Sequence, residues 1–118
     1  MFQAGDIREW RAHDVVDPQG RRIGSLEAIY VDTATDEPCF ATVLTGLPTR
    51  RRLTFVPLAG ATVGPGYLRV AHEKDLVKRA PAIDTDGELP AKDEPEIFAH
   101  YDIAYSPGSD GERRLARR

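Results

Sequence analysis

Short apolar stretches, interrupted at regular intervals by proline and glycine, dominate the first 71 residues. Five stretches favour strands: the segment that begins at Val15, and residues 21–32, 39–45, 51–57 and 67–71. They are rich in β-branched or aromatic residues and are bounded by turn residues. Spacing of this kind is typical of a small closed barrel. We therefore predict an all-β (mainly) fold, a barrel of about five or six strands between residues 14 and 71.

The alternation of apolar and polar residues predicts which side chains form the core. Leu26, Ala28 and Tyr30 share one face of their strand, while Ile29 and Val31 lie on the other. Apolar groups on both faces indicate a strand that is covered in part on both sides. We expect most of the core to come from nine residues: Leu26, Ala28, Tyr30, Phe40, Val43, Phe55, Val56, Leu68 and Val70.

Turn chemistry separates these strands. In the turn at residues 17–20, Asp17 is expected to bond to nearby backbone N–H groups and Gly20 to accept a positive φ. Asp32 is expected to open the next turn. Glycine inside a strand often marks a bend, and this is our interpretation of Gly24.

Two further residues are predicted to end strands, and one segment is predicted to connect them. Gly46 breaks the strand 39–45, and Pro57 ends the strand 51–57, because proline cannot donate to a central ladder. Residues 58–66 are interpreted as a tight connection.

The remaining chain differs in character. Residues 72–79 predict one or two helical turns, residues 82–92 an extended or loosely ordered linker, and the chain from Ser106 onward a disordered tail. We divide the chain into a barrel domain, 1–79, and an extension, 80–118, that contains an acidic linker, a short docked helix and a disordered basic tail.

A short helix is expected near residues 94–101. Asp93 is its candidate N-cap, with Glu96 three residues later as a capping-box partner. So short a helix is unstable alone, so it should dock on the barrel through Ile97, Phe98 and Tyr101.

Charge and cysteine content narrow the class of protein. The 118 residues carry a net charge of −3, which argues weakly against a general nucleic-acid binder. Residues 80–102 hold seven acidic residues and one basic residue. Cys39 is the single cysteine, so no internal disulfide forms, and we expect it to be a small core residue in a reducing cytoplasm. We see no secretion signal and no apolar run long enough to span a bilayer.

The pattern resembles the PRC-barrel family, which is named for the cytoplasmic domain of the photosynthetic reaction centre H subunit and includes the C-terminal domain of a ribosome maturation factor. The resemblance rests on a D-x-x-G turn at residues 17–20, an I-G bend at Gly24, an apolar strand that ends in Asp32, a second strand at residues 40–46 and a V-P step at Pro57. It implies a barrel that docks on proteins or ribonucleoprotein, and it implies no shared catalytic residues.

The extension resembles that of stand-alone bacterial members of this family. Glu94, His100 and Tyr101 stand in corresponding places. Asp102 departs from the pattern, since glycine is expected there and aspartate adopts the left-handed conformation less readily.

No group of residues predicts catalytic, cofactor or metal chemistry. His13, His72 and His100 are scattered and lack paired ligand spacing. The serines have no nucleophile-elbow context, and no phosphate-binding glycine loop occurs. We expect no enzyme, no cofactor and no metal.

Arg50, Arg51 and Arg52 stand where a turn enters a strand. Guanidinium groups bind carboxylates and phosphates through a planar fork, so the triplet is a candidate partner-binding site. Two alternatives remain open: a solvated strand edge, or internal pairing with the acidic residues of 84–96. Trp10 is interpreted as a plug at one end of the barrel rather than as a ligand platform.

We therefore expect a cytoplasmic, non-catalytic protein-interaction or scaffold module with a protein partner and no membrane insertion. The alternative is an RNA- or ribosome-associated factor that binds through an arginine patch, with the arginines of residues 113–118 in support. A homo-oligomer also remains open. An enzyme or small-ligand carrier has no positive feature in the sequence.

Overall fold

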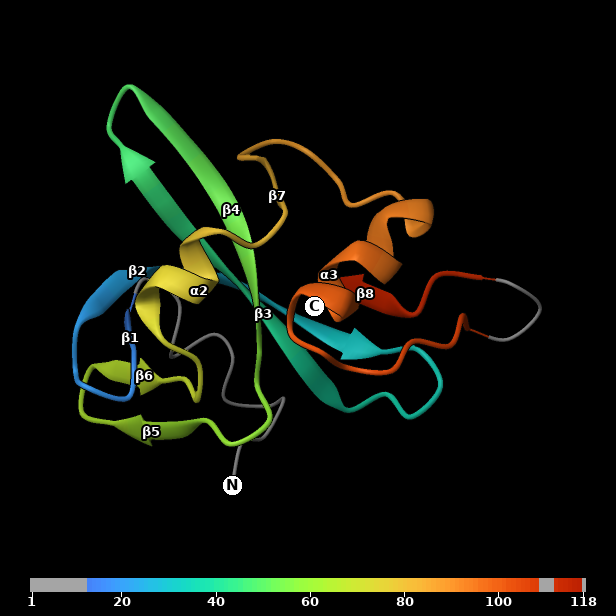
Figure 1. Cartoon of the computed structure of the whole chain (residues 1–118), viewed down its shortest axis with the longest axis horizontal. Coiled ribbons are helices and arrows are strands. Elements are labelled where there is room, and N and C mark those ends of the chain that lie inside the picture. Colours follow the sequence, from blue (N-terminus) through green and yellow to red (C-terminus); the bar gives the residue numbers. More distant parts are fainter. Residues whose placement is uncertain (1–12, 109–111, 118) are drawn as a thin grey trace.

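Eight strands form one sheet in residues 13–108 and 112–117, the parts of the chain that the computed structural model describes (Figure 1). The strands are β1 (Asp14–Val16), β2 (Arg22–Asp32), β3 (Pro38–Leu47), β4 (Arg50–Pro57), β5 (Thr62–Gly64), β6 (Tyr67–Arg69), β7 (Ala82–Asp84) and β8 (Leu115–Arg117). Their order is β5-β6-β1-β2-β3-β4-β7, and β8 pairs with β2 outside this path. Strand β2 therefore pairs with β3 along one edge and with both β1 and β8 along the other.

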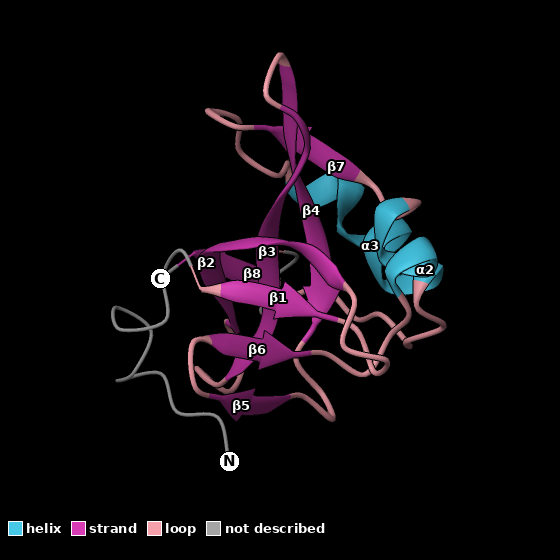
Figure 2. Ribbon diagram, turned by 90° about the vertical axis from the view of Figure 1, so that its left-hand side faces the viewer, coloured by secondary structure: helices cyan, strands magenta, loops and turns pink. Residues whose placement is uncertain are grey.

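The mainly β class is confirmed, and so is the presence of six strands between residues 14 and 71. The expected barrel closure is wrong, because the sheet is open. Its end strands in the described residues are β5 and β7, which do not pair with each other. The reason is that β7 occupies the outer edge of β4, which closure would need for a strand from the other end (Figure 2).

The core contains the residues that the apolar pattern of the strands predicts. All nine expected residues are buried, and none is more than 5% exposed. Ile29 and Val31 are also buried, so both faces of β2 are covered as expected. The rings of Tyr30 and Phe55 lie 5.0 Å apart, in the tilted contact that aromatic pairs favour.

In the described residues, three short helical segments follow the strands β1–β6. They are α2 (Lys74–Lys78), the 3-10 turn η2 (Ala91–Asp93) and α3 (Glu94–His100). As predicted, α3 docks through Ile97, Phe98 and Tyr101, all of which are buried in the core. The ring of Phe98 lies 5.1 Å from that of Phe40, and the hydroxyl of Tyr101 donates a hydrogen bond to the carbonyl oxygen of Phe55 at 2.6 Å.

The extension is more ordered than its sequence indicates. Residues 82–84 of the expected loose linker form β7, which pairs with residues 52–54 of β4. Residues 115–117 of the expected disordered tail form β8, which pairs with residues 30–32 of β2. The connection at residues 58–66 contains β5. Three-residue strands carry little local signal, because neighbouring strands decide whether they pair.

The start of α3 corrects a second expectation. Asp93 occupies the N-cap position, but its side chain makes no capping hydrogen bond. Its backbone angles, φ −95° and ψ −6°, are helical because η2 runs directly into α3. A capping side chain needs an extended N-cap backbone, so the predicted capping box does not form.

The end of α3 shows how the chain accommodates Asp102. This residue has φ +56°, in the left-handed region, and its N–H donates to the carbonyl oxygen of Ala99. The N–H of Ile103 donates to the carbonyl oxygen of Phe98. These two bonds form a Schellman motif, in which the position of Asp102 favours glycine.

Replacing Asp102 with glycine should therefore raise the free energy of unfolding by about 0.5–1 kcal/mol, because glycine adopts a positive φ without the steric cost of a Cβ. Urea denaturation of the two proteins measures the difference. The matched variant Asp102→Ala keeps the Cβ and should be less stable than the glycine variant. If the glycine variant is no more stable than wild type, this interpretation of the helix end is wrong.

Candidate interaction surface

The three arginines of the triplet lie on the hairpin formed by β3 and β4. These strands pair from Phe40 and Pro57 at the base to Leu47 and Arg50 at the tip. Pairing of β3 with β2 stops at Leu44, and pairing of β4 with β7 stops at Arg52. The end of the hairpin therefore extends beyond its neighbours (Figures 1 and 2).

Gly46 is required near the tip for two reasons. Its φ is +98°, a value that favours glycine. A Cβ at this position would also lie far inside contact distance of the carbonyl oxygen of Arg50 on the paired strand. Gly46 thus does not end β3 as expected; it lies within the strand, which continues to Leu47.

The hairpin tip, defined here as residues 47–51, combines an apolar side chain with two cations. Leu47 is 72% exposed, and Arg50 and Arg51 are exposed as well. Successive strand residues point to opposite faces, so Arg50 and Arg51 project from the two faces of the ribbon. Within the described residues, neither guanidinium forms a hydrogen bond or an ion pair.

Arg52 has a different environment. Its guanidinium donates a hydrogen bond to the carbonyl oxygen of Ala82 at 3.1 Å, and its backbone is in register with Asp84 of β7. None of the ion pairs among the described residues joins the triplet to the acidic residues of 84–96. The extension is therefore held beside the triplet by strand pairing instead of the internal ion pairs considered above.

Asp17 and Gly20 form the predicted turn between β1 and β2. Asp17 Oδ1 accepts hydrogen bonds from the N–H groups of Gln19 and Arg21, and Gly20 has φ +83°. Asp17 is fully buried, and its Oδ2 accepts from the Arg21 guanidinium and from the N–H of Lys74. Burial opposes ionisation, but the hydrogen bonds from Arg21 and Lys74 outweigh it and lower the pKa of Asp17. The carboxylate therefore ties the turn to the start of α2.

The other predicted motif residues also have structural contacts. Asp32 opens its turn by accepting from the N–H of Ala34 at 2.8 Å, and it forms an ion pair of 2.7 Å with Arg114. Pro57 ends β4 as predicted and is buried. Gly24 lies opposite Val15 of β1, beside the register shift of this strand pair.

Sequence reasoning missed the role of Glu94. In the sequence, Glu94 stands out only as the start of the expected helix and as part of the family resemblance. Its side chain is nevertheless fully buried. Glu94 Oε1 accepts from the hydroxyl of Tyr105 at 2.7 Å and from the N–H of Arg114 at 2.9 Å. Its Oε2 accepts from the N–H groups of Arg114 and Leu115 at 3.0 and 2.9 Å. No local pattern could reveal partners that lie 11 to 21 positions away.

The basic tail is also a structural element. Arg114 pairs with Asp32, and Arg117 pairs with Glu27, both on β2. Together with Glu94, these pairs hold β8 on the sheet. Two of the arginines that supported an RNA-binding tail, Arg114 and Arg117, are thus engaged in ion pairs within the protein.

The side chains of His72, His100 and Cys39 pack against other residues of the protein. His72 and His100 flank the ring of Tyr101 at 4.8 and 4.9 Å, and His100 Nε2 donates to the carbonyl oxygen of Leu76. Burial raises the pKa of the Cys39 thiol to about 12, so this half-buried group stays protonated. In the described residues, no three histidine, cysteine or carboxylate side chains gather as metal ligands. Trp10 lies outside the described residues.

No helix in the described ranges has the length and apolar character needed to cross a membrane.

Comparison with known proteins assigns no family, since no family model matches the sequence and no curated protein matches it.

Proposed function

We propose that this chain is a non-catalytic protein-interaction module that binds an acidic segment of a partner protein through the hairpin tip. The observation that carries the proposal is the pair of exposed guanidinium groups of Arg50 and Arg51, which have no ion-pair partner among the described residues, beside the exposed Leu47. Arginine is less strongly hydrated than lysine and binds carboxylates in a bidentate manner. Apolar anchors and arginines are enriched where proteins bind each other.

The charges around the hairpin favour an acidic protein segment over RNA. Asp84 lies beside Arg52, and Asp86 and Glu88 follow in the same exposed connection. Carboxylates beside Arg52 repel a long phosphate backbone that would pass over them, whereas a short acidic segment can contact the tip alone. Arg114 and Arg117, which an RNA-binding tail would use, are occupied by Asp32 and Glu27.

The two fully buried carboxylates, Asp17 and Glu94, support a non-catalytic role. Both oxygens of each accept hydrogen bonds from the protein's own groups. A general acid or base needs an oxygen available to substrate, which neither residue provides. The resemblance to the PRC-barrel family, which implies docking on proteins or ribonucleoprotein, also supports a binding role over a catalytic one.

The test is a pull-down from a native extract with the full chain and with the double variant Arg50→Ser/Arg51→Ser. The variant should recover about tenfold less partner at low salt and retain the wild-type melting temperature, because exposed substitutions shift stability little. The difference should shrink as salt rises, since ions screen the attraction between exposed charges.

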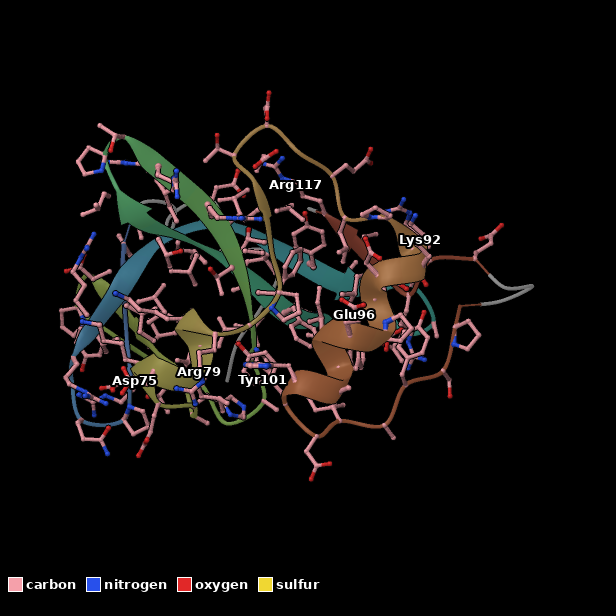
Figure 3. The ribbon with its side chains drawn as sticks, turned by 45° about the horizontal axis from the view of Figure 1, so that its top comes forward. Asp75, Arg79, Lys92, Glu96, Tyr101 and Arg117 are labelled. Atoms are coloured by element: carbon pink, nitrogen blue, oxygen red, sulfur yellow. The ribbon has the colours of Figure 1, made fainter. Side chains whose placement is uncertain are left out.

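A matched control is Lys78→Ser/Arg79→Ser, which removes two exposed cations at the end of α2 (Figure 3). This variant should recover the partner as wild type does. Equal recovery by the hairpin variant at every salt concentration would overturn the proposal. Recovery that disappears after ribonuclease treatment, together with a salt-dependent gel shift of ribosomal RNA, would favour RNA as the partner instead.

A further inference from the structure

A cavity of about 500 Å³ lies between β8 and the connection that follows β7. Tyr30 of β2 lines it together with Asp86 and Glu88 of the connection and with Arg113 and Arg117 of the C-terminal segment. Figure 3 shows Arg117 beside this connection. The volume is within the range of about 300–1,000 Å³ found for small-molecule sites.

The hydroxyl of Tyr30 is the first sign of a ligand. Tyr30 is only 5% exposed, and its hydroxyl has no hydrogen-bond partner among the described residues. The oxygen is not fully enclosed by protein atoms. Tyr101 and Tyr105, by contrast, donate to Phe55 and Glu94. The side chain is buried while its oxygen opens to the cavity, so the hydrogen-bond partner of this hydroxyl must come from the cavity.

The charges on the two walls are the second sign. Two acidic residues, Asp86 and Glu88, line one wall, and two basic residues, Arg113 and Arg117, line the other. No ion pair joins the two walls in the described residues. Arg117 is paired with Glu27, while Arg113 donates only one weak hydrogen bond of 3.3 Å, to the carbonyl oxygen of Leu89. Arg113 therefore keeps most of its donors for a ligand.

We propose that this cavity binds a small zwitterion, such as an amino acid or a dipeptide. The ligand carboxylate accepts hydrogen bonds from Arg113 and from the Tyr30 hydroxyl, and the ligand ammonium lies against Asp86 and Glu88. A zwitterion satisfies both walls at once, whereas an anion or a cation alone leaves one wall unpaired. This site is separate from the hairpin tip and does not depend on the proposed function.

The environment of Tyr30 suits its role as a donor. Burial raises the pKa of Tyr30, with the positive charge of Arg117 acting in the opposite direction. The phenol therefore stays protonated at neutral pH and keeps its proton for a carboxylate. Its ring is held by Phe55, so the hydroxyl is positioned before the ligand arrives.

Isothermal titration of the full chain with a series of zwitterions tests the proposal. The series is glycine, 4-aminobutanoate, 6-aminohexanoate and diglycine, with butanoate and butylamine as probes that carry one charge each. We expect at least one zwitterion to bind with a Kd below about 1 mM. Butanoate and butylamine should each bind about tenfold more weakly, because each loses one charged contact.

Tyr30→Phe should weaken zwitterion binding about tenfold without lowering the melting temperature, since the hydroxyl makes no internal hydrogen bond. Asp86→Asn should also weaken it. Tyr67→Phe is the matched control, because Tyr67 lies on β6 and does not line this cavity. The proposal is overturned if no zwitterion binds in this range, if either singly charged probe binds equally well, or if Tyr30→Phe binds as wild type does.

Discussion

Replacing Glu94 with alanine should lower the free energy of unfolding by about 3–5 kcal/mol, because it removes the acceptor of three donors, one of them buried and two half-buried. These donors are the N–H groups of Arg114 and Leu115 and the hydroxyl of Tyr105. Each buried donor that loses its partner costs about 1–3 kcal/mol. Urea denaturation followed by circular dichroism measures the loss. Faster amide hydrogen exchange at Leu115 should show that β8 separates from the sheet.

The matched control for this prediction is Glu96→Ala. Glu96 lies on the same helix, is exposed, and should change stability by no more than about 0.5 kcal/mol (Figure 3). Glu94→Gln keeps one acceptor oxygen but turns an amide towards a backbone N–H, so its effect should lie between the two. A loss below about 1 kcal/mol for Glu94→Ala would show that water replaces the carboxylate and that β8 is held by other contacts.

Replacing Gly24 with valine should lower the free energy of unfolding by about 3 kcal/mol or more, well above the ~1 kcal/mol expected from strand preference alone. A Cβ at this position would lie far inside contact distance of the carbonyl oxygen of Leu44 and 2.8 Å from Cγ1 of Val43. The carbonyl belongs to the backbone of a paired strand, so relief requires β2 and β3 to separate. Thermal and urea denaturation measure the effect.

Gly66→Ala separates this steric effect from backbone conformation. Gly66 has φ +76°, but a Cβ there would meet no atom within 4 Å, so the cost should be only about 1 kcal/mol. Gly24→Ala, which adds one carbon, should already exceed that value. If Gly24→Val is as stable as wild type, the close approach of β2 and β3 is not required by the fold.

The contact at Gly24 also affects the position of the hairpin tip. Leu44 is the last residue of β3 that pairs with β2, so the contact with Gly24 lies where the hairpin leaves the sheet. Beyond Leu44, the residues of β3 pair with β4 alone. The close contact at Gly24 thus fixes where the hairpin leaves β2, and the tip remains available to a partner.

The sequence by itself determined the features whose causes are local. Period-two alternation identified Leu26, Ala28, Tyr30, Leu68 and Val70, and the apolar, β-branched or aromatic character of the strands identified the other four core residues, including the adjacent Phe55 and Val56. The turn at residues 17–20 was predictable because Asp17 bonds to N–H groups only two and four positions away. The docking of α3 was predictable because a seven-residue helix with an apolar stripe is unstable unless it packs.

Only the tertiary structure decided the features that join distant segments. Strands β7 and β8 form because β4 and β2 offer unpaired edges, and the presence of β7 on that edge leaves the sheet open. The arginines of the triplet and of the tail look alike in sequence, yet Arg114 and Arg117 are paired with β2 while Arg50 and Arg51 project from a hairpin. The roles of Glu94 and Tyr30 depend on partners or walls tens of residues away, and local pattern carries no information about such distances.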